Sequence, residues 1–174
     1  VYKRQVGKGA MAAILGLNFD TVQSLTNLAQ AQALGICQAA NDNDPSQVVI
    51  SGEKSAVELA IDLAKEEGAK RAIMLPVSAP FHCEMMAPAA EQMKIKLDSI
   101  KIDTPIVPIV SNVSAEAISD PDTLKKLLVS QVTGSVRWRE SILWMAANEV
   151  DEIWEVGSGK ALSGMIRRID KDIS

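Results

Sequence analysis

Hydrophobic and polar positions in the first half of the chain follow two alternating patterns. Short apolar runs predict four strands, over residues 10–17, 36–40, 47–51 and 71–77. Between them, apolar residues recur at helical spacing in two segments, from about Asp20 to Ala33 and from about Ser55 to Glu67. Asp20 is the expected N-cap of the first helix. Gly35 and Gly68 mark the expected helix ends.

The order of these elements predicts a fold. Residues 41–46 are dense in turn-forming types, so they are expected to be a turn between the second and third strands, with local Asx hydrogen bonds at Asn41 and Asn43. Strand–helix–strand–strand–helix–strand is the split βαβ, or ferredoxin-like, arrangement. We therefore expect an antiparallel four-stranded sheet with two helices on one face.

The second half has a different pattern. Apolar residues at helical spacing predict a long helix directly after His82, and further helices are expected at Asp120-Pro121, over 138–148 and after Gly157-Ser158-Gly159. Two strands are predicted, over 105–111 and 152–156. This alternation indicates part of a parallel α/β sheet. Two strands are too few for a core of their own, so apolar faces at 106–107 and 153–156 are expected to lack partners.

Composition restricts the function classes. The 174 residues carry a net charge of −4, which argues against nucleic acid as a partner, and no apolar run reaches the ~20 residues that span a membrane. Cys37 and Cys83 are too few for a disulfide framework, and with one histidine they form no zinc spacing. No metal site is expected, and a reducing cytoplasm is the expected location. Residues 1–6 resemble an adapter scar and the chain start, so the chain is interpreted as a fragment.

His82 is the only histidine, and it lies where the run 71–77 ends in a proline-bracketed turn. An imidazole takes and returns protons near neutral pH, and loops at strand ends often present catalytic groups. A surface or capping histidine is the alternative. The neighbouring Cys83 is a candidate nucleophile, although a core thiol is the more ordinary interpretation. The chain contains no Gly-x-Ser-x-Gly elbow.

Two other motifs have ordinary interpretations. Gly157-Ser158-Gly159-Lys160 fails the phosphate-loop template, because Trp154 stands where a glycine is required. The basic pairs Lys125-Lys126 and Arg167-Arg168 are interpreted as solvated helix faces, with docking of an acidic partner left open for the arginines.

Four strings in order resemble one family, and they are listed here as they stand: Gly9-Ala10-Met11-Ala12-Ala13-Ile14-Leu15-Gly16-Leu17, Asn41-Asp42-Asn43-Asp44-Pro45-Ser46-Gln47-Val48-Val49-Ile50-Ser51-Gly52, Leu75-Pro76-Val77-Ser78-Ala79-Pro80-Phe81-His82-Cys83 and Glu155-Val156-Gly157-Ser158-Gly159-Lys160. They are similar to the C-terminal part of the bacterial malonyl-CoA:acyl carrier protein transacylases. The resemblance implies an α/β protein with a ferredoxin-like small subdomain, here residues 7–80. Residues 81–174 would be the C-terminal part of a large α/β-hydrolase-like acyltransferase subdomain.

The resemblance also implies a chemistry, which is ping-pong transfer of a malonyl group from coenzyme A to the phosphopantetheine thiol of acyl carrier protein in fatty acid biosynthesis. His82 matches the catalytic base, Gln131 matches the residue whose backbone carbonyl orients that base, and Asn43 matches a residue near the acyl site. Malonyl-CoA and acyl carrier protein are the implied partners, and no cofactor is implied. The family's nucleophilic serine, malonyl-binding arginine and N-terminal oxyanion-hole residue have no counterpart here, so the fragment alone is expected to be inactive.

Other functions remain open at this stage. The parent protein could be the acyltransferase module of a polyketide synthase, or an enzyme of other acyl specificity, for which Phe81 is the only local indication. A non-catalytic ferredoxin-like interaction module is a third interpretation. An RNA-binding domain of this fold is disfavoured by the acidity and by an aromatic content of 3%.

Overall fold

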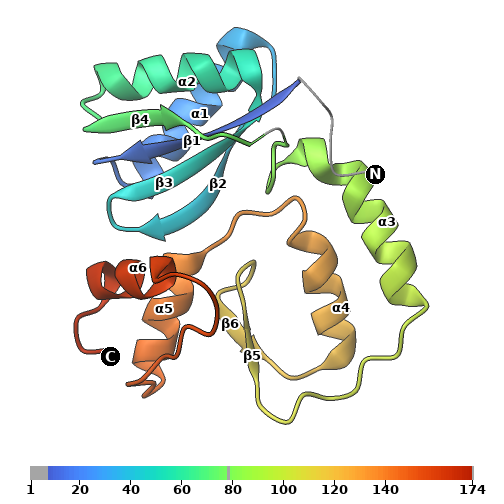
Figure 1. Ribbon diagram of the computed structural model, residues 1–174. Helices are drawn as coiled ribbons and strands as arrows, with labels where there is room; N and C mark the ends of the chain where they lie inside the picture. The colour runs from blue at the N-terminus through green and yellow to red at the C-terminus, as the bar shows by residue number, and fades with distance from the viewer. Residues whose placement is uncertain (1–7, 78, 174) are drawn as a thin grey trace.

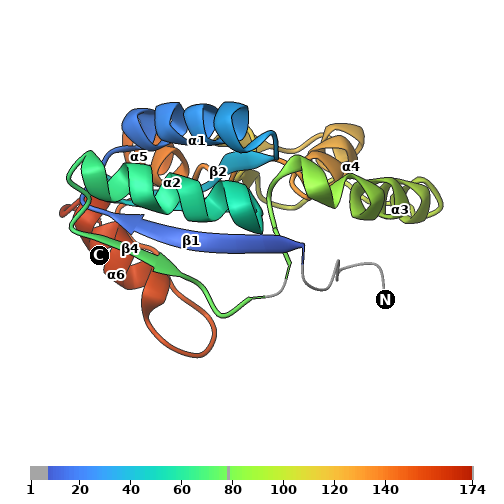
Figure 2. The same cartoon turned by 90° about the horizontal axis from the view of Figure 1, so that it is seen from above.

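The computed structural model describes residues 8–77 and 79–173, so the segment interpreted as an adapter scar lies outside the described residues. The first half contains β1 (Gly9–Leu15), α1 (Phe19–Ala33), β2 (Cys37–Asp44), β3 (Gln47–Glu53), α2 (Lys54–Glu66) and β4 (Arg71–Met74). Its four strands form an antiparallel sheet in the order β2-β3-β1-β4, with α1 and α2 together on one side (Figures 1 and 2). The predicted split βαβ arrangement is confirmed.

Side chains from the two faces of this sheet enter different clusters. Ala12 and Ile14 of β1 point toward α1 and α2, where they are almost fully buried with Ile50 of β3. Met11, which precedes Ala12 in β1, points to the opposite face, where it packs with Ala40 and Val49 and with the partly buried Leu75 and Phe81. The alternation of strand side chains therefore gives the sheet a main core under the helices and a smaller cluster on the other face.

The first helix begins and ends differently from the prediction. Its N-cap is Asn18, whose Oδ1 accepts a hydrogen bond of 2.9 Å from the amide of Thr21. The expected cap, Asp20, lies instead in the first turn, where its negative charge favours the helix N-terminus. After Ala33 the left-handed residue is Leu34, with φ of 51°, and not Gly35.

The expected turn over 41–46 is largely strand. β2 continues to Asp44, and only Pro45 and Ser46 connect it to β3. A local Asx hydrogen bond exists, but at Asp44, whose Oδ1 accepts from the Ser46 amide at 3.0 Å. The carboxylates of Asp42 and Asp44 are 1% exposed and are paired with arginines from distant helices. Long-range pairing therefore overrides the local turn preference of these residues.

The second half contains a 3-10 turn η1 (Glu84–Met86), α3 (Ala87–Asp98), β5 (Ile109–Ser111), β6 (Glu116–Ile118), α4 (Pro121–Ser130), α5 (Trp138–Ala147) and α6 (Ala161–Ile169). Asp120 caps α4 as predicted, because its side chain accepts from the Thr123 amide at 2.7 Å. α5 and α6 share a small core of Ile142, Ile166 and Ile173 and lie against β2 (Figure 1).

The strands of the second half differ from the prediction. β5 and β6 form an antiparallel hairpin, and the described residues contain no parallel sheet. Only the last three residues of the expected strand 105–111 are extended into β5, and 152–156 form no strand. The predicted lack of apolar partners explains this, because Ile106 is 103% exposed and Val156 94% exposed. A strand without a neighbour has no partner for its backbone hydrogen bonds.

Candidate functional site

His82 lies in a tight turn between β4 and η1. Its backbone has φ of 59°, the left-handed region that L-residues rarely adopt. The turn is held from both sides: the Cys83 thiol donates to the Pro80 carbonyl at 3.2 Å, and the Met86 amide donates to the Cys83 carbonyl at 2.9 Å. Gly9 of β1 packs so closely under the turn that a Cβ there would lie 2.4 Å from the Pro80 ring. The histidine therefore projects from a backbone held rigidly by its neighbours.

Gln131 meets this histidine from a segment 49 residues away. It is the C-cap of α4, and its backbone carbonyl lies 2.9 Å from Nδ1 of His82. The Gln131 side-chain amide is also near Nδ1, at 3.4 Å. The two contacts require opposite states of the nitrogen: the carbonyl needs an N–H on Nδ1, and the amide needs a lone pair. The shorter carbonyl contact favours Nδ1–H, which leaves Nε2 free to accept a proton.

The structure places Asn43 in β2, 9% exposed, between Asp42 and Asp44. Within the described residues its side chain makes no hydrogen bond to His82 or Gln131. The structure therefore brings together two of the three predicted site residues, His82 and Gln131, while Asn43 lies on β2 and bonds to neither.

Sequence reasoning missed two ion pairs that join β2 to the second half. Arg139 of α5 holds Asp42 in a fork, with Nε 3.1 Å and 3.0 Å from the two carboxylate oxygens and a terminal nitrogen 2.8 Å from Oδ2. Arg168 of α6 holds Asp44, with Nε 2.9 Å from Oδ2. Arg168 was predicted to lie on a solvated helix face, and its side chain is 50% exposed, but its guanidinium also pairs with the buried Asp44. The sequence offered little signal for these pairs, because both aspartates lie in the polar, turn-forming stretch 41–46.

The cysteines are core residues in this structure. Burial raises the pKa of the Cys37 thiol to about 12. Burial also raises the pKa of Cys83, which is fully enclosed beside His82. A thiol that resists ionisation is a poor nucleophile, so the buried-core interpretation of Cys83 is favoured over the catalytic one.

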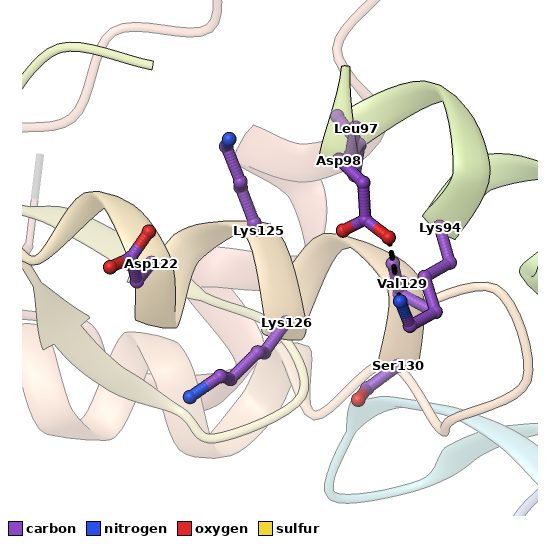
Figure 3. Close-up of a pocket in the computed structure, with 8 residues that line it drawn as sticks. All are labelled: Lys94, Leu97, Asp98, Asp122, Lys125, Lys126, Val129 and Ser130. Atoms are coloured by element: carbon purple, nitrogen blue, oxygen red, sulfur yellow. Dashed lines mark hydrogen bonds and ion pairs between the residues drawn. The ribbon is translucent and has the colours of Figure 1, made fainter. Parts of the chain in front are cut away.

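A hollow of about 520 Å³ lies between α3 and α4 and is shown in Figure 3. Its cations do not converge on one point. Lys94 is paired with Asp98 at 2.6 Å, and the ends of Lys125 and Lys126 point away from each other (Figure 3). Over residues 8–77 and 79–173 no group of three or more His, Cys, Asp or Glu side chains is placed to hold a metal. In the same residues no helix is both long and apolar enough to cross a bilayer.

No family model matches the sequence, but comparisons with known proteins find close similarity to one group of enzymes. Among curated relatives, the malonyl CoA-acyl carrier protein transacylase of Bacillus subtilis is 45% identical over 165 residues, which is 95% of this chain and 52% of that protein. The Escherichia coli K12 protein of the same name is 42% identical over 94% of this chain and 52% of its own length.

Solved structures give the same result. The acyl-carrier-protein S-malonyltransferase of Bartonella henselae superposes with a TM-score of 0.92 at 52% identity, covering 97% of this chain and 53% of that one. A malonyl-transacylase solved in complex with a type II polyketide acyl carrier protein has a TM-score of 0.92 at 36% identity, covering 96% and 53%.

The chain has the α/β fold of the acyltransferases, with a split βαβ sheet and helices packed against its β2 edge. Within that class, the chain belongs to the malonyl-CoA:acyl carrier protein transacylase family. It spans about half the length of the curated relatives it matches.

Proposed function

We propose that this chain supplies the base-bearing part of a malonyl-CoA:acyl carrier protein transacylase that acts in fatty acid biosynthesis. The observation that carries the proposal is the 2.9 Å contact between the Gln131 carbonyl and Nδ1 of His82. A base that must accept a proton at Nε2 requires its Nδ1 proton to be held by an acceptor, and this carbonyl is placed to hold it.

In the proposed reaction, a serine attacks the malonyl thioester while Nε2 of His82 takes the hydroxyl proton. The tetrahedral intermediate then expels the thiolate of coenzyme A, which takes that proton from the imidazolium. In the second half-reaction the phosphopantetheine thiol of acyl carrier protein gives its proton to Nε2 and attacks the malonyl ester. The serine oxygen then leaves and takes that proton from the imidazolium, which restores the free hydroxyl. No Gly-x-Ser-x-Gly elbow occurs in these 174 residues, so the serine would lie outside them.

The carbonyl would tune this base differently from a carboxylate. An anion on Nδ1 stabilises the imidazolium by charge, whereas a neutral carbonyl fixes the ring and its tautomer with less stabilisation of the positive charge. The resulting base would return its proton to the leaving thiolate more readily. Ready return of the proton suits this reaction, because His82 would have to protonate the coenzyme A thiolate in the first half-reaction and the serine oxygen in the second.

The remaining parts of the proposal concern the whole protein. Malonyl-CoA and acyl carrier protein are the proposed substrates, supported by the names of the relatives and by the carrier protein complex of one of them. No cofactor is needed for this chemistry. We place the protein in the cytoplasm, because both cysteines are buried thiols and the net charge is negative.

The test is a chimera in which the N-terminal half of the Bartonella henselae relative precedes residue 6 of this chain. We expect it to transfer malonyl from malonyl-CoA to phosphopantetheinylated acyl carrier protein, measured by intact-protein mass spectrometry. His82→Ala should lower the rate by about 10²–10⁴, the usual contribution of a positioned acid–base group. Lys65→Ala, on the exposed surface of α2, is the control and should leave the rate unchanged.

Three outcomes would contradict the proposal. A folded chimera that transfers no malonyl group would leave the non-catalytic interaction module. A His82→Ala chimera with near-normal transfer would remove His82 as the base, whatever the parent enzyme does. Transfer of a different acyl group in preference to malonyl would support an acyltransferase of other specificity.

A further inference from the structure

We propose that Asp42 and Arg139 are positioning residues that hold the Gln131 carbonyl against His82, with β2 as the common support for both sides of the contact. The consequence for catalysis rests on the proposed function, whereas the positioning itself can be tested without it. Neither residue touches the imidazole, so their effect would pass through the backbone that carries Gln131.

The turn that carries His82 is hydrogen-bonded to the beginning of β2. Gln38 accepts a hydrogen bond of 2.7 Å from the amide of Glu84, two residues after His82. The same glutamine side chain donates to the Glu84 carboxylate at 3.3 Å. Gln38 therefore contacts both the backbone and the side chain of a residue at the end of the histidine turn.

The segment that follows Gln131 is hydrogen-bonded to the middle of the same strand. Five residues after Gln131, Val136 forms a short parallel bridge with β2. Its amide donates to the Ala40 carbonyl at 2.8 Å, and its carbonyl accepts from the Asp42 amide at 2.9 Å. Two backbone hydrogen bonds alone make a marginal strand pairing, so a second restraint is needed to keep this segment in register.

Asp42 and Arg139 supply that restraint. The carboxylate belongs to the residue whose amide closes the bridge, and the guanidinium lies three residues beyond Val136. A planar guanidinium that binds both carboxylate oxygens fixes direction as well as distance. The short loop between Gln131 and Val136 is further tied by the Gln131 side chain, which donates to the Gly134 carbonyl at 3.3 Å.

The two arginine pairs on β2 differ in what they hold. Arg168 binds Asp44 from α6, a helix that carries no part of the Gln131 segment. Asp42 and Asp44 are both 1% exposed, lie two residues apart and each lose an arginine partner when they are truncated. Asp44 also accepts hydrogen bonds from the amide and hydroxyl of Ser46 at 3.0 Å and 3.1 Å, so its truncation removes further contacts and is a stringent control for an effect of lost stability alone.

The single histidine gives a direct readout, because nitrogen NMR of ¹⁵N-labelled chain shows only one imidazole. On the neutral ring we expect the Nδ1–H tautomer to dominate. Asp42→Ala should raise the ratio of Nε2–H to Nδ1–H about fivefold, the equivalent of one ordinary neutral hydrogen bond. Asp44→Ala should leave the ratio within about twofold of the wild-type value, although both variants lower the unfolding temperature.

Conservative variants protect the test against simple loss of folding. Asp42→Asn keeps an oxygen that can accept from Arg139, and it should retain the wild-type ratio. Arg139→Lys keeps the charge but loses the fork, and it should give an intermediate ratio. Circular dichroism at the temperature of the NMR experiment establishes that each variant is folded.

The proposal is overturned if folded Asp42→Ala or Arg139→Lys keeps the wild-type tautomer ratio. It is also overturned if Asp44→Ala shifts the ratio as much as Asp42→Ala, because the effect would then follow from lost stability alone. Neither result would bear on malonyl transfer by the chimera, so failure of the positioning and failure of the proposed function are separate observations.

Discussion

The two halves of the molecule differ in how completely they bury their own apolar residues. In the sheet region, β1, β3 and the facing sides of α1 and α2 form a continuous core in which Ile14, Val57 and Ile50 are at most 1% exposed. In the second half, α3 has no buried residue and Trp154 is 79% exposed. The contact between His82 and Gln131 joins the turn that follows the sheet region to the end of α4.

This difference in burial indicates that the sheet region contributes most of the free energy that stabilises the fold. Burial of apolar surface is the dominant stabilising term, at roughly 25 cal/mol per Å². The sheet region gains this term from its own residues, whereas the apolar side chains of α3, of residues 106–107 and of Trp154 and Val156 stay largely exposed. Exposed apolar surface of this kind usually marks an interface, and the relatives of this chain are about twice its length.

The sharpest test of this difference is a pair of identical substitutions. Ile50→Ala should lower the free energy of unfolding by about 2–5 kcal/mol, because Ile50 is 1% exposed and truncation leaves a cavity. Ile106→Ala should change it by less than about 0.5 kcal/mol, because Ile106 is fully exposed. Urea unfolding followed by circular dichroism measures both. Equal effects at the two sites would mean that Ile106 is covered in solution.

The same difference explains how much of the fold could be predicted from the sequence. In the sheet region, strand alternation and helical spacing agree with the tertiary packing, and four strands and two helices were predicted in the observed order. The residue pattern of 152–156 is typical of a β-strand, yet the structure forms no strand there. A strand needs a neighbouring strand for its hydrogen bonds, and the described residues do not provide one. Local pattern is informative only where its hydrogen-bond partners are present.

The site shows a second limit of sequence reasoning. His82 was found because it is the only histidine and follows a strand, and Gln131 was found only through the family resemblance. The Asp42–Arg139 pair was missed because it joins residues 97 positions apart. A turn-forming composition at 41–46 concealed it, since Asp and Asn are common in turns and buried aspartates are rare unless paired.

A smaller effect is expected where the sheet region supports the histidine turn. Gly9→Ala should cost about 1–3 kcal/mol, because the new Cβ would lie 2.4 Å from the buried ring of Pro80 and the turn must move. We also expect the His82 NMR signals to shift, since Pro80 is two residues from the histidine.

Gly164→Ala is the matched control for this substitution. Its Cβ would meet nothing closer than an Arg168 nitrogen at 3.9 Å, within a helix where alanine is favoured by roughly 1 kcal/mol. The two glycine substitutions should therefore have opposite signs in thermal unfolding. A Gly9→Ala protein with unchanged stability and unshifted histidine signals would show that β1 and the turn are not in contact.

The smallest expected effect is a pH dependence at the junction of the two halves. Burial raises the pKa of Asp42 above its ordinary value of 3.8, against the lowering effect of the Arg139 hydrogen bond. Glu140 and Asp20, the other charges that face it, raise the pKa further. The folded protein thus keeps this proton at pH values where the unfolded chain has lost it. The contribution of Asp42 to stability must fall as pH rises from about 3.8 through its folded pKa.

Glu140 has the opposite sign, which provides the comparison. Its hydrogen bond from Arg137 holds the pKa of Glu140 below its ordinary value of 4.5, so its contribution is present above that value and is lost as pH falls. Relative to wild type, Asp42→Asn should therefore gain stability with rising pH, and Glu140→Gln should lose it, in urea unfolding between pH 3 and pH 7, with the Glu140 effect confined to the range below about 4.5. Parallel pH profiles would mean that the pKa of Asp42 is not raised in the folded chain, so that burial of its carboxylate does not outweigh the Arg139 hydrogen bond.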